Sequence, residues 1–146
     1  MSDAMQPTNP INLSSAGKRY TEVFAPWVQQ LNLSIETIAE DSVVLRMPYA
    51  DDLCRINQLV CGQAMMTLID TCMVFVCYVA QGKYCNCTTV SQNTSFMRPV
   101  MGQDILATGR VLKSGRSLVF GEVTLRAAGD GRIVCCGTST YMVLPD

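Results

Sequence analysis

The sequence predicts an α+β domain in which a long central helix is wrapped by an antiparallel sheet of about five or six strands. Two observations predict this fold class. Residues 61–80 are apolar on nearly every side, and a helix without a polar face has to be surrounded by protein. After Gly82, strand-like segments alternate with turn residues, which is typical of antiparallel strands joined by short connections.

The elements before the central helix follow from periodicity and turn chemistry. Apolar residues from 20 to 31 recur at helical spacing, so they predict an amphipathic helix that Pro26 kinks or splits. Residues 33–48 favour two strands that turn at residues 40–42, because apolar and β-branched residues flank that polar turn. A polar loop at residues 49–58 leads to the central helix.

The elements after the helix are strand-like segments separated by turn chemistry. Turn residues stand at 99–102, 114–115 and 129–131. The segments between and around them are residues 86–99, 103–115, 116–129 and 132–145. We expect each segment to pair with the next in consecutive antiparallel hairpins.

The chain of 146 residues has the size of one domain around one core. Residues 1–16, rich in Pro, Ser and Asn, predict a flexible N-terminal tail, and residues 17–146 form the single folded domain. The tail lacks a basic start followed by an apolar run, so it does not indicate a secretory signal. We therefore expect a cytoplasmic protein.

Charge and hydropathy limit the partners. A net charge of −1 and a pI near 5.3 argue against nucleic acid and anionic membrane surfaces, which attract clustered basic residues. The central helix is at the short limit for a membrane span, and Asp70 at a bilayer centre would cost about 3 kcal/mol. With 49% hydrophobic and 16% charged residues, part of the apolar surface is expected to be covered by self-association, so we predict a homo-oligomer, either a dimer or a tetramer.

The chain contains no histidine, which excludes Ser-His and Cys-His pairs and imidazole bases. Acid–base chemistry has to come from carboxylate, Lys, Tyr or Cys side chains. The eight cysteines form no CxxC pair, and without an export signal we expect reduced thiols that pack as small apolar groups. We predict neither a metal site nor a cofactor.

The order of elements and the residues around the helix resemble the hotdog fold, and within it the PaaI-like acyl-CoA thioesterases. That family has His-Gly-Gly at the start of the central helix and an acidic residue nine positions after the His. Here Cys61-Gly62-Gln63 stands at that place and Asp70 at the ninth position, so Cys61 and Gln63 replace the His and the second Gly. Further matches are "TTVSQNTSFMRPV" and "VLKSGRSLVFGEVTL", and the similarity covers residues 20–144.

The resemblance implies a catalytic set. Asp70 would be the nucleophile or general base, the backbone N–H at Gly62 would polarise the thioester carbonyl, and the Thr89 hydroxyl would help to position water. Arg55 stands where some relatives have an Asn near the carbonyl. An oxyanion hole at Gly62 needs no side chain, because a helix N-terminus presents unsatisfied N–H groups and a positive dipole.

The candidate substrate-binding residues lie in two places. Cys61, Gln63 and Asn57 are at or just before the helix start. Lys113 and Arg116 flank the predicted Ser-Gly turn and could meet the phosphates of coenzyme A, although charged residues at an exposed hairpin are also ordinary.

Helix geometry separates the two main candidates. At 1.5 Å per residue, Asp70 lies roughly 13 Å along the axis from Cys61, whereas reacting atoms must approach within about 3.5 Å. Gly62 and Asp70 of one chain therefore cannot form one site. We expect a two-fold dimer in which the helix start of each subunit faces the acid of the other, and inactive monomers.

Two alternatives stay open. Asp70 could be a structural acid held by neighbouring hydroxyls such as those of Thr67 and Thr71. The chain could also be a non-catalytic acyl-CoA-binding protein that lost activity together with the His-Gly-Gly signature. A hotdog dehydratase is disfavoured by the missing His.

Overall fold

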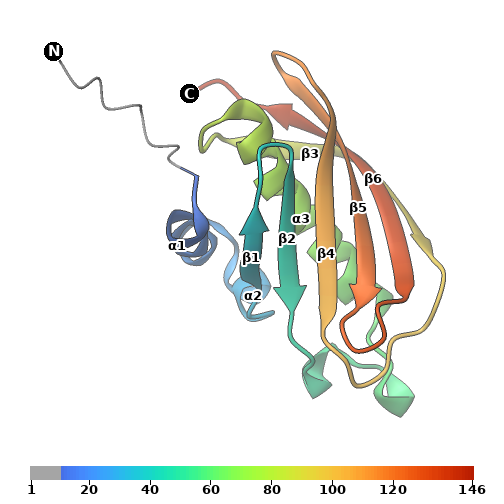
Figure 1. The fold of residues 1–146 in the computed structure, drawn as a ribbon. Helices are drawn as coiled ribbons and strands as arrows, with labels where there is room; N and C mark the ends of the chain where they lie inside the picture. Colours follow the sequence, from blue (N-terminus) through green and yellow to red (C-terminus); the bar gives the residue numbers. More distant parts are fainter. Residues whose placement is uncertain (1–10) are drawn as a thin grey trace, which may run out of the picture.

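A long helix, α3 (Gly62–Gln81), lies against one face of a six-stranded antiparallel sheet in the computed structural model, which describes residues 11–146 (Figure 1). The strands are β1 (Ser34–Ile38), β2 (Ser42–Met47), β3 (Cys87–Phe96), β4 (Ile105–Ser114), β5 (Leu118–Ala127) and β6 (Ile133–Val143). The α+β class and the central helix predicted from the sequence are confirmed.

The order of strands in the sheet differs from the predicted chain of hairpins. The order is β1-β2-β4-β5-β6-β3, so β3 pairs with β6 at an edge and not with β4. The prediction of a β3–β4 hairpin at residues 99–102 is therefore wrong. Those turn residues belong to a connection that carries the chain from the sheet edge back to the middle, and the hairpins are β1–β2, β4–β5 and β5–β6.

Three glycines allow α3 to lie close to the middle strands. A Cβ atom on Gly109 of β4 would lie 2.6 Å from Val76 Cγ2, and one on Gly121 of β5 would lie 2.6 Å from the Met73 Sδ. Gly137 of β6 is similarly tight against Ile69. One glycine on each strand beneath the helix therefore sets the distance between helix and sheet.

The apolar surface of α3 is covered mainly by protein. Among residues 11–146 it is the one helix long and apolar enough to cross a membrane, yet about 61% of its most apolar window is buried inside the domain. The helix ends at Gly82, which adopts the left-handed conformation at φ 69° that favours glycine. Lys83 N–H then donates to the Tyr78 carbonyl at 3.2 Å. Burial of this kind is typical of a core helix.

Two short helices precede the sheet, α1 (Leu13–Val23) and α2 (Pro26–Gln29). The predicted split at Pro26 is confirmed, since proline stands at the first position of α2. The predicted tail was wrong for residues 13–16, because α1 begins at Leu13. Asn12 and Ser15 form a capping box that stabilises this start, and residues 1–10 of the predicted tail lie outside the described residues.

The loop before α3 contains two single 3-10 turns, η1 (Asp51–Leu53) and η2 (Ile56–Gln58). The eight cysteines are free thiols, and Cys72, Cys77, Cys85 and Cys135 are buried. Burial of four thiols among apolar side chains agrees with their expected use as small hydrophobic groups.

The close approach of α3 to the sheet predicts that Gly109→Ala destabilises the domain. The added methyl group would meet Val76 and the Cys72 sulfur at 2.6 and 2.7 Å, and such overpacking costs about 1–3 kcal/mol. Urea unfolding measures this loss. Gly17→Ala is the matched control, because a Cβ there meets nothing within 4 Å and alanine favours a helix, so its stability should be equal to or above that of the parent. Equal stability of both variants would contradict the packing argument.

Candidate active site

Asp70 lies in the middle of α3 and is half-buried, and donors from two strands hold its carboxyl group. The Thr89 hydroxyl of β3 donates to Oδ1 at 2.8 Å. The Tyr141 hydroxyl of β6 donates to the same Oδ1 through a short hydrogen bond and also lies 2.8 Å from the Asp70 main-chain oxygen. The sheet therefore fixes both the side chain and the backbone of Asp70.

The pairing of β3 with β6 brings these two donors together. Thr89 and Tyr141 are direct partners in that ladder. The register shifts between Thr89 and Ser91, which is a bulge at Val90. Thr89 and Gln92 can both contact α3 because of this extra residue, and the Gln92 amide donates to the Met66 carbonyl at 3.2 Å.

Thr67 does not support the alternative in which hydroxyl groups of the same helix hold Asp70 as a structural acid. The Thr67 hydroxyl donates to the Gln63 carbonyl of its own helix at 2.8 Å. The two donors to the Asp70 carboxyl group come from β3 and β6, far along the chain. Asp70 is therefore tied to the sheet and not capped within its helix.

Sequence reasoning missed Tyr141. Its side chain is 1% exposed, and burial together with the Asp70 carboxylate raises the pKa of Tyr141 far above its usual value. A tyrosine on the inward face of a strand could have signalled this contact, because a buried phenol hydroxyl needs a hydrogen-bond partner.

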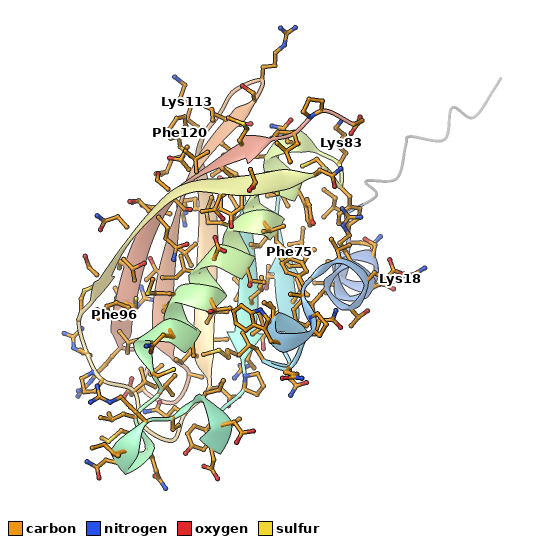
Figure 2. The ribbon with its side chains drawn as sticks, turned by 180° about the vertical axis from the view of Figure 1, so that it is seen from behind. Lys18, Phe75, Lys83, Phe96, Lys113 and Phe120 are labelled. Atoms are coloured by element: carbon orange, nitrogen blue, oxygen red, sulfur yellow. The ribbon has the colours of Figure 1, made fainter. Side chains whose placement is uncertain are left out.

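A cavity of about 400 Å³ opens beside Asp70. Apolar side chains from α2, α3 and the residue that follows α1 make most of its wall, and hydroxyl and amide groups lie near the carboxylate. The lining residues are Phe24, Trp27, Val28, Met66, Thr67, Asp70, Thr71, Val74, Thr89 and Gln92. Figure 2 shows the side that carries α3, with Phe75 between α3 and α1, where its ring stacks on Phe24 at 5.6 Å. The cavity therefore combines one acid with room for an apolar group.

Gly62 opens into a different cavity, of about 350 Å³. Arg55 and Arg98 also line it, and Phe96 closes one side with its ring 3.4 Å from the place of a Gly62 Cβ atom (Figure 2). Asp70 is not among the residues that line this cavity. The structure thus keeps Gly62 and Asp70 of one chain apart, as helix geometry requires.

The cavity at Gly62 is electropositive. The helix N-terminus and two guanidinium groups lie around it, and Arg98 is a second residue that sequence reasoning missed. The Arg98 Nη1 donates to the Ile133 carbonyl at 2.8 Å, which holds the side chain over β6. Such a place suits a carbonyl that gains negative charge.

The other predicted substrate-binding residues lie around α3 in different places. Cys61 and Gln63 line a cavity of about 360 Å³ together with Trp27. Asn57 is exposed in η2, where it adopts the left-handed conformation with φ 62°. These three residues surround the start of α3, and their binding roles stay predictions.

Lys113 and Arg116 lie on the exposed β4–β5 hairpin (Figure 2). The Gln81 amide donates to Ser114 Oγ at 3.2 Å, so the hairpin lies beside the C-terminal end of α3. This is the end opposite to Gly62. A single chain therefore does not bring these cations to the helix start, and only another subunit could do so.

A six-stranded antiparallel sheet around a central helix that carries a carboxylate defines a hotdog-fold protein. The family model of the thioesterase superfamily matches residues 58–134, which include α3 and strands β3, β4 and β5. The chain belongs to this superfamily. Membership supports hydrolysis of thioesters in general.

Comparison with individual proteins agrees with this assignment. The chain is 24% identical over 131 residues to a protein of Thermoplasma acidophilum named "Putative esterase", a match that covers 87% of this chain and 96% of the relative. It superimposes on zebrafish thioesterase superfamily member 2 with a TM-score of 0.79, 22% identity and coverage of 92% and 99% of the two chains. The Escherichia coli PaaI protein gives a TM-score of 0.79, 16% identity and coverage of 90% and 92%. The hotdog fold expected from the sequence is confirmed.

Proposed function

We propose that the protein is a homo-oligomeric thioesterase that hydrolyses an acyl-CoA to the free acid and coenzyme A. The observation that carries the proposal is the half-buried Asp70, whose Oδ1 is held by β3 and β6 beside a mostly apolar cavity. A carboxylate that is kept in place next to space for an acyl group suits attack on a carbonyl or activation of water.

The reaction would use groups from two subunits. Asp70 as general base accepts a proton from water while the water oxygen bonds to the thioester carbon. The oxyanion accepts hydrogen bonds from the N–H groups at Gly62 and Gln63 of a neighbouring subunit. Collapse of the intermediate breaks the C–S bond and releases the thiolate, which takes back the proton from Asp70 and leaves as the thiol. Asp70 as nucleophile would form an acyl anhydride instead, which water then hydrolyses. Thr89 orients the carboxylate in both versions.

Exposed apolar surface supports an oligomer of this kind. β3 is a ten-residue edge strand, and most of its residues are exposed. Val90 and Phe96 on that edge are 54% and 49% exposed, and Trp27 at the Asp70 cavity is 59% exposed. A second subunit could cover this surface and bring its own helix start to Asp70. A cytoplasmic location stays a prediction.

Asp70→Asn should lower kcat for acyl-CoA hydrolysis about 100-fold or more, because the amide is neither a base nor a nucleophile. The thermal midpoint should change little, since the carbonyl oxygen of the new amide side chain can still accept from Thr89 and Tyr141. Thiol release across a panel of aryl and alkyl acyl-CoAs measures the effect. Equal background turnover in both proteins, with retained binding of acyl-CoA, would favour the non-catalytic binding protein.

Subunit mixing tests the shared site. Gly62 is the first residue of α3, where proline is compatible with the helix but removes the N–H group, so Gly62→Pro deletes the proposed donor. Gly62→Pro and Asp70→Asn should each be inactive alone. Co-refolded at equal amounts, they should recover about a quarter of the parent activity, because half of the dimers are mixed and each mixed dimer has one intact site. Recovery no greater than the sum of the separate variants would contradict a site built from two subunits.

A further inference from the structure

We propose that Tyr141 is a positioning residue for Asp70, an inference that rests on the proposed function. Its hydroxyl lies within hydrogen-bond distance of two oxygens of the same residue, Oδ1 and the main-chain carbonyl oxygen. The contact therefore fixes the side chain relative to the helix backbone. We infer that it directs the second carboxyl oxygen, Oδ2, toward the cavity.

The hydrogen bonds to Asp70 are unequally divided between its two oxygens. Oδ1 accepts from both Thr89 and Tyr141. Within residues 11–146 no hydrogen bond to Oδ2 is formed, although Asp70 lines the cavity. Occupation of one oxygen by two donors limits rotation of the carboxyl group and leaves the lone pairs of the other oxygen for water or a thioester carbon.

Tyr141 can hold this position because the sheet packs around it. The side chain is 1% exposed, and Val119 of β5 and Thr89 of β3 are its partners on the two neighbouring strands. A buried ring between two strands has little freedom to turn its hydroxyl away from Asp70. Loss of the hydroxyl alone would thus leave the carboxyl group with one donor in place of two.

Neutral donors stabilise the carboxylate at this site. Burial keeps the pKa of Tyr141 raised, so its hydroxyl stays a donor at working pH. Cys87 of β3 is the next titratable neighbour of Tyr141, and a hydrogen bond with Cys77 raises the pKa of Cys87 to about 12, so this thiol also stays neutral. Phe24, which follows α1, and Trp27 and Val28 of α2 line the Asp70 cavity, and they carry no charge.

Tyr141→Phe tests the inference, because it keeps the buried ring and removes only the hydroxyl. We expect kcat to fall about tenfold or more with little change in KM, since an interaction that prepares the acid is lost while the substrate contacts remain. Tyr78→Phe is the matched control: Tyr78 is equally buried on α3, and its hydroxyl accepts from Arg19 without contacting Asp70.

A second measurement does not depend on activity. The carboxyl ¹³C chemical shift of Asp70, assigned with Asp70→Asn and measured at one fixed pH, reports its hydrogen bonds. It should change in Tyr141→Phe but not in Tyr78→Phe. Replacement of Tyr141 by 3-fluorotyrosine, a stronger hydrogen-bond donor, should move this chemical shift in the opposite direction, and it serves if the Phe variant does not fold.

The outcomes separate the two proposals. An Asp70 carboxyl signal that moves in a protein without thioesterase activity would overturn the proposed function and keep the placement of Asp70 by Tyr141. An active enzyme whose kcat and Asp70 carboxyl signal are the same with and without the Tyr141 hydroxyl would overturn the role of Tyr141, even if stability fell.

Discussion

A carboxylate in the middle of a helix that is apolar on all sides has to find its hydrogen-bond donors outside that helix. Asp70 finds them on β3 and β6, and the strand order of the sheet makes this possible. Had β3 paired with β4, as consecutive hairpins would require, Thr89 would not lie beside Tyr141. The long connection after β3 therefore serves the site as well as the sheet.

Helix α3 also separates the proposed oxyanion hole from the proposed catalytic acid. Its length places the N–H groups at Gly62 and the carboxylate of Asp70 in different cavities of one chain. Edge strand β3 carries Thr89 beside Asp70 and Phe96 beside Gly62, and it exposes the apolar side chains of Val90 and Phe96. Assembly of subunits would then be part of catalysis, because a second subunit would both complete the active site and cover the exposed edge of β3.

Local patterns in the sequence predicted most of the helices and strands, but they did not predict which strands pair with one another. The apolar run at residues 61–80 marks α3 to within one residue, because a long uninterrupted apolar run is a strong signal of a core helix. The position of β3 in the sheet was missed because a turn motif between two strands does not determine whether those strands pair with each other. The start of α1 was missed because the capping pair Asn12 and Ser15 carries little signal within a polar stretch. At the site, Asp70 and Thr89 were named from resemblance, whereas the hydrogen bond between them and the role of Tyr141 needed the fold.

The absence of histidine is compatible with this arrangement on physical grounds. Thiolates leave readily, so cleavage of a thioester depends on attack and on stabilisation of the oxyanion more than on protonation of the leaving group. A helix N-terminus supplies that stabilisation from its backbone, and Arg55 and Arg98 add positive charge at the same cavity. The remaining requirement is a carboxyl group held in one orientation beside a largely apolar wall. The hydroxyls of Thr89 and Tyr141 hold it without a buried cation, whose desolvation would otherwise have to be offset.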